Sequence, residues 1–215
     1  MSEALTLIAQ ISDLHIKANG RLSYKKVDTQ AALLRVIDTL NRLLPRPDMV
    51  VITGDLVDFG TAEEYQTLRS ALRRLQLPYM LMAGNHDDRQ QLRAAFPDHQ
   101  YLQRGETLNW QARVKGVQLL ALDSSVPQQP WGYVDEAQVA WLEQQLAREP
   151  HLPTLVMLHH PPVMSGIGHM DKQPLRNPEA LAKIIGQHPQ VERVLSGHLH
   201  RSIQARFAGT LVSVA

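Results

Sequence analysis

Side chains that bind metal ions or transfer protons follow five of the apolar stretches in this sequence. The five segments read "SDLH", "GD", "GNHD", "HHPP" and "GHLH". They supply carboxylate, imidazole and amide groups, and the chain has no cysteine to add a thiolate. Oxygen and nitrogen ligands of this kind suit Zn, Mn, Fe or Co. The segments therefore predict a metal site that is free of sulfur ligands.

The number of these side chains indicates two metal ions rather than one. The candidates are Asp13, His15, Asp55, Asn85, His86, Asp87, His159, His160, His198 and His200. Even seven such ligands exceed the needs of one tetrahedral ion, whereas two ions that share a bridging carboxylate can use them. The two polar residues of "DLH" and of "HLH" are two positions apart, so in an extended chain they point the same way. Two-metal sites hold the attacking and leaving oxygens of an in-line displacement.

Each segment taken alone also has an ordinary structural explanation. "GD" and "GN" are common turn sequences, "HHPP" can form a rigid corner, and an Asp-x-His pair is frequent by chance. Five such segments after successive apolar stretches are poorly explained in this way, so we favour a shared site. His99, His151 and His188 lie near prolines and are expected in solvent. For His169, a surface position and a substrate-facing position both stay open.

The apolar stretches alternate with helical patterns, which predicts an α/β fold. Strands are expected at 5–11, 49–52, 77–83, 117–122, 154–158 and 191–195, with a hairpin formed by 202–207 and 210–215. Helices are expected near 27–44, 61–75, 89–96, 135–146 and 177–185, with Thr61, Asp135 and Asn177 as N-caps. Uninterrupted apolar strands indicate sheets that are buried under helices. Ligand sites of open α/β sheets lie beyond the carboxyl ends of the strands, where the five segments fall.

Composition narrows the classes of partner. The 22 basic and 21 acidic side chains leave a net charge of +1, so nucleic acid is not an expected partner. No apolar stretch of about 20 residues exists to span a membrane. Residues 1–4 lack the basic start of a signal peptide, and we expect a cytoplasmic protein. We expect one domain over residues 1–215, in which the aperiodic segment 161–176 is a candidate binding loop.

The ordered motifs identify a family. "SDLH", "TGDLVDFG", "AGNHDD", "LHHPP" and "SGHLH", which span Ile8 to at least Arg201, resemble those of the calcineurin-like metallophosphoesterase superfamily. The sequence looks most like class III 3',5'-cyclic nucleotide phosphodiesterases and bacterial glycerophosphodiesterases. The resemblance implies a four-layer αββα sandwich with a dimetal site at one edge of its two sheets. Members of this family usually continue beyond the position of Ala215, so we expect the C-terminal end of the domain to be missing.

The resemblance also assigns roles to the candidate residues. It implies one ion held by Asp13, His15, Asp55 and His200, and a second held by Asp55, Asn85, His159 and His198. Asp55 would bridge the two ions. His86 is then a catalytic residue near the scissile phosphate rather than a ligand. His160 would support the site or pack against it, and Asp58 would orient His86.

These roles imply a reaction. A water shared by two divalent cations is hydroxide near neutral pH and can attack phosphorus in line. His86 can donate a hydrogen bond to the phosphoryl group or protonate the leaving alkoxide. Protein phosphatases of the superfamily carry an arginine where this chain has Phe59, and without that guanidinium a dianionic monoester is disfavoured.

The expected function is hydrolysis of a small phosphodiester by two divalent metal ions. Cyclic AMP is the leading substrate, and glycerophosphodiesters or a broad range of diesters are the alternative. A phosphomonoesterase or nuclease, and a non-catalytic scaffold of the same fold, rank below these. The choice among Fe, Mn, Zn and Co stays open, as does a homo-oligomeric state.

Overall fold

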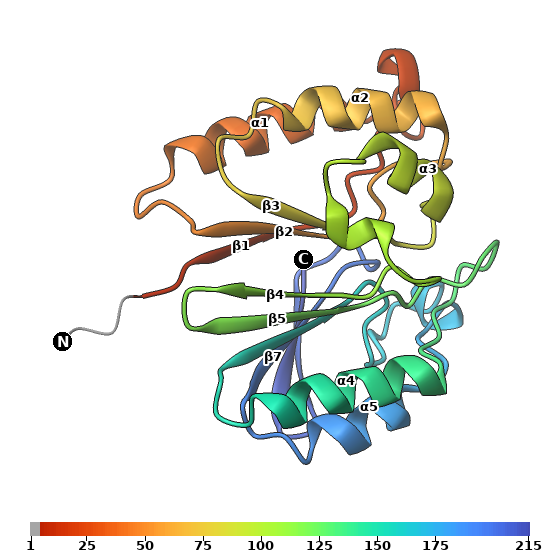
Figure 1. The fold of residues 1–215 in the computed structure, drawn as a ribbon. Helices are drawn as coiled ribbons and strands as arrows, with labels where there is room; N and C mark the ends of the chain where they lie inside the picture. The colour runs from red at the N-terminus through yellow and green to blue at the C-terminus, as the bar shows by residue number, and fades with distance from the viewer. Residues whose placement is uncertain (1–4) are drawn as a thin grey trace.

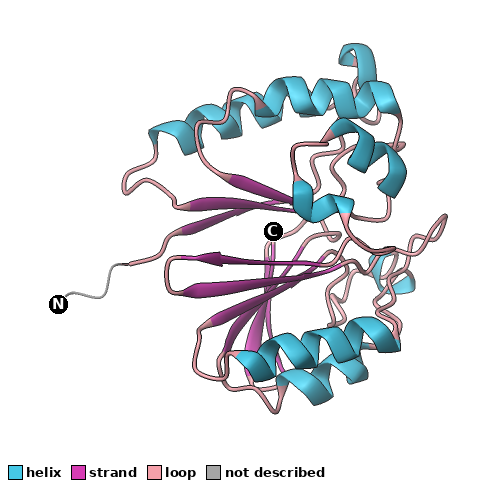
Figure 2. Ribbon diagram, in the orientation of Figure 1, coloured by secondary structure: helices cyan, strands magenta, loops and turns pink. Residues whose placement is uncertain are grey.

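Two β-sheets lie face to face between two layers of helices in the computed structural model, which describes residues 5–215 (Figures 1 and 2). Helices α1 (Thr29–Arg42), α2 (Ala62–Leu72) and α3 (Arg89–Ala95) cover one sheet. Helices α4 (Glu136–Arg148) and α5 (Pro178–Ile185) cover the other. The expected αββα arrangement is therefore confirmed. Residues 1–4, on which the expectation of no signal peptide rests, lie outside the described residues.

The first sheet positions three of the five candidate segments. It has the order β1 (Ile8–Ile11), β2 (Met49–Thr53) and β3 (Tyr79–Met82), and all of its strands are parallel. Helix α1 connects the first pair and helix α2 connects the second. Because the strands are parallel, their carboxyl ends and the residues that follow them meet at one edge.

The second sheet has six strands in the order β4-β5-β6-β7-β9-β8. These strands are β4 (Trp110–Val114), β5 (Val117–Leu122), β6 (Thr154–Leu158), β7 (Val191–Ser196), β8 (Ile203–Phe207) and β9 (Thr210–Val214). The four central strands are parallel, and an antiparallel strand closes each edge. The expected hairpin is confirmed as β8 and β9. Strand β4 was not predicted, because the polar side chains of Gln111 and Arg113 interrupt it.

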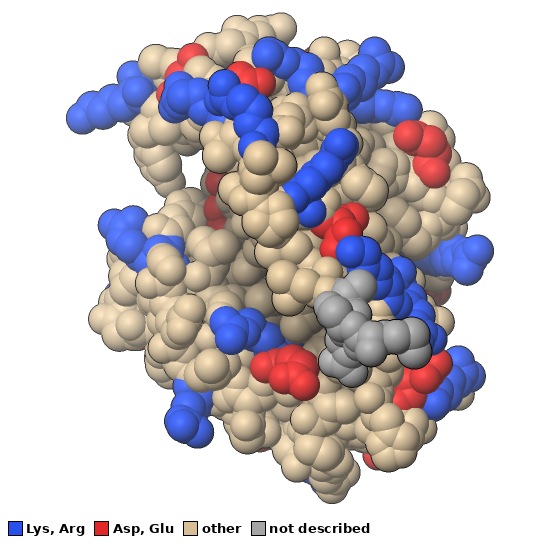
Figure 3. Space-filling view, turned by 90° about the vertical axis from the view of Figure 1, so that its left-hand side faces the viewer, with Lys and Arg blue, Asp and Glu red and all other residues tan. Residues whose placement is uncertain are grey.

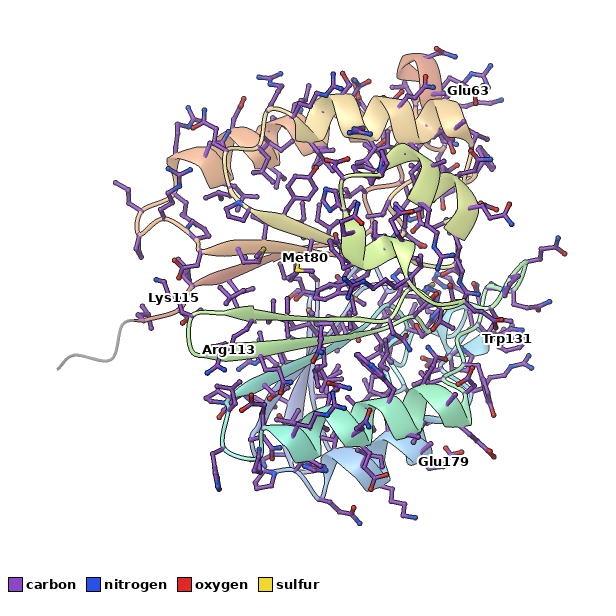
Figure 4. The ribbon with its side chains drawn as sticks, viewed as in Figure 1. Glu63, Met80, Arg113, Lys115, Trp131 and Glu179 are labelled. Atoms are coloured by element: carbon purple, nitrogen blue, oxygen red, sulfur yellow. The ribbon has the colours of Figure 1, made fainter. Side chains whose placement is uncertain are left out.

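Burial on both faces explains the continuous apolar strands. In β5, Leu119 and Ala121 pack into the core shared with the first sheet, whereas Leu120 and Leu122 pack under α4 and α5. Met80 of β3 is 8% exposed and lies between the two sheets (Figure 4). The first core includes residues from both sheets, so each sheet fixes the position of the other.

Helix ends follow the sequence with one exception. Thr61 and Glu64 form a capping box at the start of α2, and Asp135 forms one with Gln138 at the start of α4. Such caps stabilise a helix by about 1 kcal/mol. Asn177 precedes α5, but its side chain bonds both main-chain groups of Val134 instead of capping the helix. Asn177 therefore occupies the predicted N-cap position before Pro178, but without a side-chain cap bond. Its side chain instead joins two segments that are distant in the sequence.

The shorter helical turns lie in connections. They are η1 (Ala18–Gly20), η2 (Gln100–Gln103) and η3 (Met170–Lys172). The last of these lies within the segment predicted to be a binding loop. No helix in residues 5–215 is both long enough and apolar enough to cross a membrane. On the face opposite the strand ends, basic and acidic side chains both occur over the two helical layers (Figure 3).

Candidate metal centre

The five segments converge at the carboxyl ends of β1, β2, β3, β6 and β7. The two sheets lie next to each other there, on the right-hand side of Figure 1. The first sheet contributes the segments after β1, β2 and β3, and the second sheet contributes those after β6 and β7. The predicted convergence of residues that are remote in sequence is thus observed.

One group of four candidate ligands forms a compact cluster. The donor atoms of Asp13, His15, Asp55 and His200 all lie within 4.8 Å of one another. Nε2 of His200 lies 3.3 Å from Oδ1 of Asp13 and 3.0 Å from Nε2 of His15. Nε2 of His15 lies 3.6 Å from Oδ2 of Asp55. These four residues are the set that the resemblance implies for one ion.

A second set of donors shares Asp55 with the first. Oδ2 of Asp55 lies 3.3 Å from Nε2 of His159, and that nitrogen lies 3.2 Å from Oδ1 of Asn85. The ring of His198 lies 5.2 Å from that of His159, centre to centre. Asp55 is the residue that contacts both sets, which suits the bridging position that the resemblance implies.

Main-chain partners fix which ring nitrogens can bind a cation. Nδ1 of His159 donates to the carbonyl oxygen of Thr53 at 2.9 Å, so Nε2, which lies toward Asp55, is the nitrogen that can bind a cation once its proton has left. Nε2 of His198 donates to the carbonyl oxygen of Gln173 at 3.0 Å, which leaves the lone pair on Nδ1. Lone pairs and carboxylate oxygens gathered at these distances repel one another unless cations lie among them. The donors therefore fit two divalent ions.

The charges at the site support cation binding. Burial alone would raise the pKa of the Asp55 carboxyl, but the imidazoles of His159 and His15 hold this pKa far below its usual range. Burial would lower the pKa of His159, but the Asp55 carboxylate raises it to about 9. Without metal a proton therefore occupies this imidazole near neutral pH. A metal ion must displace it, so metal binding here releases a proton.

Backbone turns aim the ligands, and this corrects the sequence-based argument. Asp13, His15, Asp55, His198 and His200 all have positive φ, between 41° and 73°. The expected extended chain with alternate side chains on one side is wrong here. Left-handed conformations cost energy for residues other than glycine, and they gather at functional sites. The five residues converge because the chain turns sharply at each of them.

Two glycines make room for these turns. A side chain at Gly84 would collide with the carboxylate of Asp55, and one at Gly197 would collide with Ser12 and Asp13. Neither position can accept even a methyl group without moving a predicted ligand. The glycines therefore serve close approach of the main chain to the site.

His86 lies beside the first cluster. Its main-chain N–H donates to Oδ1 of Asp55 at 3.0 Å, and its ring lies 4.7 Å from the ring of His15. Nδ1 of His86 donates to the main-chain carbonyl of Asp58 at 2.7 Å, whereas the carboxylate of Asp58 pairs with His15 and Lys17. Asp58 therefore contacts His86 through its main-chain carbonyl, whereas its carboxylate, which the prediction placed against His86, bonds His15 and Lys17 instead.

Among the described residues, His160 makes no hydrogen bond or ion pair with Asp55. It is fully buried, its Nδ1 lies 2.9 Å from Oγ of Ser124, and Gly132 packs against its ring. Burial lowers its pKa well below the usual value. One ring nitrogen of His160 does lie within 4.8 Å of ring nitrogens of His159 and His198. Distance alone therefore does not decide whether His159 or His160 is the metal ligand. Contact with Asp55 and Asn85 separates them and favours His159.

A cavity of about 500 Å³ opens over the cluster. It is lined by His15, Asp55, Asn85, His86, His198 and His200, and by Tyr24, Ile167, His169, Met170, Gln173, Leu199 and Arg201. The candidate loop 161–176 thus supplies part of the cavity wall, and His169 lies in that part. Sequence reasoning missed Tyr24 and Gln173, because neither carries a motif.

Two of the histidines expected in solvent are only partly exposed: His99, and His188, whose Nδ1 lies 3.2 Å from Nε2 of Gln190. His99 is half buried rather than in solvent. Its ring packs against Tyr79, Phe96 and Tyr101, and its Nδ1 lies 2.9 Å from the hydroxyl of Tyr101. Proximity to Pro97 was therefore a poor guide to its exposure.

Two clusters of oxygen and nitrogen donors that share a buried carboxylate, at the edge of an αββα sandwich, define a metal-dependent phosphoester hydrolase. The chain belongs to the calcineurin-like phosphoesterases, whose family profile matches residues 6–202.

Curated relatives narrow the class to diester hydrolysis. The chain is 38% identical to a probable glycerophosphodiester phosphodiesterase of Arcobacter nitrofigilis, over 91% of this chain and 72% of the relative. It is 34% identical to a 3',5'-cyclic-nucleotide phosphodiesterase of a Nostoc species, over 95% and 75%. Among solved structures, a dimetal phosphatase from Danio rerio has the same fold, with a TM-score of 0.77, 15% identity and coverage of 97% and 86%. The chain is a metal-dependent phosphodiester hydrolase.

Proposed function

We propose that the chain hydrolyses 3',5'-cyclic nucleotides, with cyclic AMP as the leading substrate. Two divalent ions would be held by Asp13, His15, Asp55 and His200, and by Asp55, Asn85, His159 and His198. The observation that carries the proposal is the buried carboxylate of Asp55, which lies 3.6 Å from Nε2 of His15 and 3.3 Å from Nε2 of His159. Bound ions would supply a nucleophilic hydroxide near neutral pH and offset the charge of the phosphate.

The residues of the chain then orient the substrate and move a proton. Nδ1 of His86 is engaged with the carbonyl of Asp58 at 2.7 Å, so its Nε2 is the nitrogen available to the substrate. His86 lines the cavity, where a protonated ring donates to a phosphoryl oxygen or to the leaving alkoxide. The main-chain bond to Asp55 holds His86 next to the metal ligands while the ring acts.

The charge of the cavity favours a diester. Arg201 is the only lysine or arginine among the described residues that line it. Phe59 is 73% exposed but carries no charge, and the charge of the nearby Lys17 is paired with Asp58. Neither residue adds a free positive charge. A singly charged diester needs less compensation than a doubly charged monoester. This favours hydrolysis of diesters over that of monoesters.

The same lining favours a neutral substituent over a cationic one. Asp55 is the only acid among the described cavity residues, and its charge is engaged with the metal ligands. An ammonium headgroup would meet Arg201 without a carboxylate to pair with. Cyclic AMP, whose base is uncharged, avoids this conflict. A glycerophosphodiester substrate stays the second candidate, because the Arcobacter relative is named for that activity.

A substrate panel tests the proposal. The metal-loaded chain is assayed with cyclic AMP, cyclic GMP, glycerophosphoethanolamine and p-nitrophenyl mono- and diesters. We expect the highest kcat/KM among the natural compounds for a cyclic nucleotide. A higher kcat/KM for glycerophosphoethanolamine would assign the second candidate. Hydrolysis restricted to p-nitrophenyl phosphate would contradict diesterase activity.

We also propose that residues 1–215 act as one domain. The core that includes β1–β3 also includes Leu119, Met157 and Leu195 of the second sheet. Neither sheet can separate from the other without exposing this core. Unfolding in urea should therefore follow one transition, and two separate transitions would contradict the proposal.

A further inference from the structure

We infer that Tyr24 is a specificity-determining residue whose ring stacks on the nucleobase of the substrate. The inference rests on the proposed function and names the part of the substrate that this side chain contacts. Tyr24 lines the cavity over the metal ligands, yet its side chain is 85% exposed. An exposed aromatic ring at the wall of a small-molecule cavity offers a large apolar surface for a planar group.

The main chain holds Tyr24 in place at an energetic cost. Tyr24 and Lys25 form the tip of a tight turn with φ values of 50° and 58°. Turns with two consecutive positive φ values normally carry Asn and Gly, because bulky side chains strain this conformation. Such strain persists only where the surrounding structure enforces it, and it gathers at ligand-binding positions. The turn is therefore a built feature of the cavity wall.

Hydrogen bonds at the base of the turn provide that enforcement. The N–H of Ser23 donates to the carbonyl of Val27 at 2.8 Å, and the N–H of Val27 donates back at 2.9 Å. Ser23 is 5% exposed, so the turn is anchored in the protein just before its tip. Shortly after the turn, Oγ1 of Thr29 donates to the carbonyl of His15 at 3.0 Å. The position of Tyr24 is thus tied to the main chain of a predicted metal ligand.

A second wall of the cavity is equally well fastened. The carboxylate of Asp171 accepts hydrogen bonds from the N–H groups of Ser165 and Gly166 at 2.8 and 2.9 Å. This closes the loop that presents Ile167 and Met170 to the cavity. The carbonyl of Gln173 in this loop accepts from Nε2 of His198 at 3.0 Å. The loop is therefore ordered relative to the metal ligands before substrate binds.

The two walls belong to opposite halves of the fold. The turn of Tyr24 follows η1, which packs against α2 on the side of the first sheet. The loop with η3 lies on the side of α4 and α5 in Figure 1. A substrate whose phosphate lies at the metal ligands would thus extend its organic group between an aromatic ring and the apolar side chains of Ile167 and Met170. A flat, uncharged base suits this space better than a flexible glycerol chain.

The test compares substrates with and without a base. Tyr24→Asn removes the ring but keeps a residue that tolerates positive φ, so the turn is retained. We expect a rise in KM for cyclic AMP on the order of 10-fold, the effect of losing one base–aromatic stack, with kcat nearly unchanged. Tyr24→Phe should restore the wild-type KM. The KM for glycerophosphoethanolamine should not change in either variant.

One control variant and one second measurement keep the result interpretable. Tyr133→Ala removes another partly exposed tyrosine, outside the cavity, and should leave both KM values unchanged. Calorimetric titration with adenosine 5'-monophosphate gives a second readout, in which Tyr24→Asn should bind less tightly than Tyr24→Phe. An unchanged KM for cyclic AMP in Tyr24→Asn would overturn the inference, as would an equal rise for both substrates. A rise for glycerophosphoethanolamine alone would show that the ring binds a cation instead.

Failure of the proposed function gives a different pattern. A wild-type chain that cleaves bis-p-nitrophenyl phosphate but neither binds nor cleaves a nucleotide would contradict the proposed function, and the inference with it. A wild-type chain that cleaves cyclic AMP, with a KM that is indifferent to Tyr24→Asn, would contradict only the role of Tyr24.

Discussion

The carboxylate of Asp58 accepts a hydrogen bond from Nδ1 of His15 at 3.2 Å. The same carboxylate pairs with Lys17, and both side chains are largely buried. Hydrogen bonds of this kind hold a metal-binding imidazole in the tautomer that keeps a lone pair on its other nitrogen. Asp58 therefore acts on the metal site through His15, and its main-chain carbonyl acts on His86.

Asp58→Ala should weaken metal binding. Loss of an outer partner of a metal-binding histidine typically costs about 10–100-fold in affinity. Metal titration of the variant measures this. Asp38→Ala, which removes a half-exposed acid that pairs with Arg74, is the control. Unchanged metal affinity with a lower kcat at saturating metal would contradict this prediction. That result would favour the role expected from the sequence, in which the carboxylate of Asp58 acts on His86.

The two adjacent histidines should behave differently. His159→Ala removes the imidazole that contacts both Asp55 and Asn85, so one of the two ions should be lost from the purified protein. His160→Ala should keep both ions but lower the Tm, because it empties a fully buried position. Elemental analysis and thermal unfolding separate the two effects. Loss of an ion from His160→Ala alone would exchange the roles of the pair.

His86→Ala should retain both metal ions and lose turnover. One positioned acid–base group contributes on the order of 10²–10⁴ in rate, and the ring of His86 is not needed by either donor cluster. The kcat for a p-nitrophenyl diester, measured alongside metal content, checks this. If metal content falls together with kcat, His86 is a ligand and its catalytic assignment is wrong.

Most of the fold and the convergence of the candidate ligands could be predicted from the sequence. Continuous apolar strands such as Val117–Leu122 are recognisable because both of their faces are buried. Strand β4 was missed because an edge strand with exposed Gln111 and Arg113 lacks that signal. The predicted ligands follow the strands, and parallel strands bring such residues together.

The remaining features depend on the path of the chain between elements. The Asn177 side chain bonds Val134, which is 43 positions away, and no local pattern indicates this. Tyr24 faces the cavity because a strained turn places it there, although the segment around it reads as an ordinary polar loop. The partner of the Asp58 carboxylate depends on side-chain directions at residues 15 and 17. Contacts of this kind follow from tertiary structure, which spacing within the sequence does not encode.

Protonation of the partly buried His99 should lower the free energy of unfolding in mild acid. Burial lowers the pKa of His99, so its folded form binds a proton less readily than the unfolded chain, whose histidines titrate near about 6.5. The contribution of His99 is therefore fully present above that pH and is lost as the pH falls through the folded pKa. Urea unfolding above the unfolded pKa and below the folded pKa of His99 measures the change. Acid should reduce the free energy of unfolding less in His99→Gln than in wild type. His151→Gln, at an exposed position, should match wild type, and equal acid sensitivity in all three proteins would refute the prediction.

The charge next to the cavity should decide between diesters and monoesters. Phe59 is 73% exposed and does not pack in the core, so substitution there should not lower the Tm. Nζ of Lys17 lies 4.3 Å from the centre of the Phe59 ring, but its charge is paired with Asp58. Wild type should therefore show a higher kcat/KM for bis-p-nitrophenyl phosphate than for p-nitrophenyl phosphate. Phe59→Arg adds an unpaired guanidinium and should narrow this ratio, whereas Phe59→Ala should leave it unchanged. If Phe59→Arg leaves this ratio of kcat/KM values unchanged, the selectivity for diesters belongs to the loop 161–176. A wild-type preference for the monoester would contradict diesterase function.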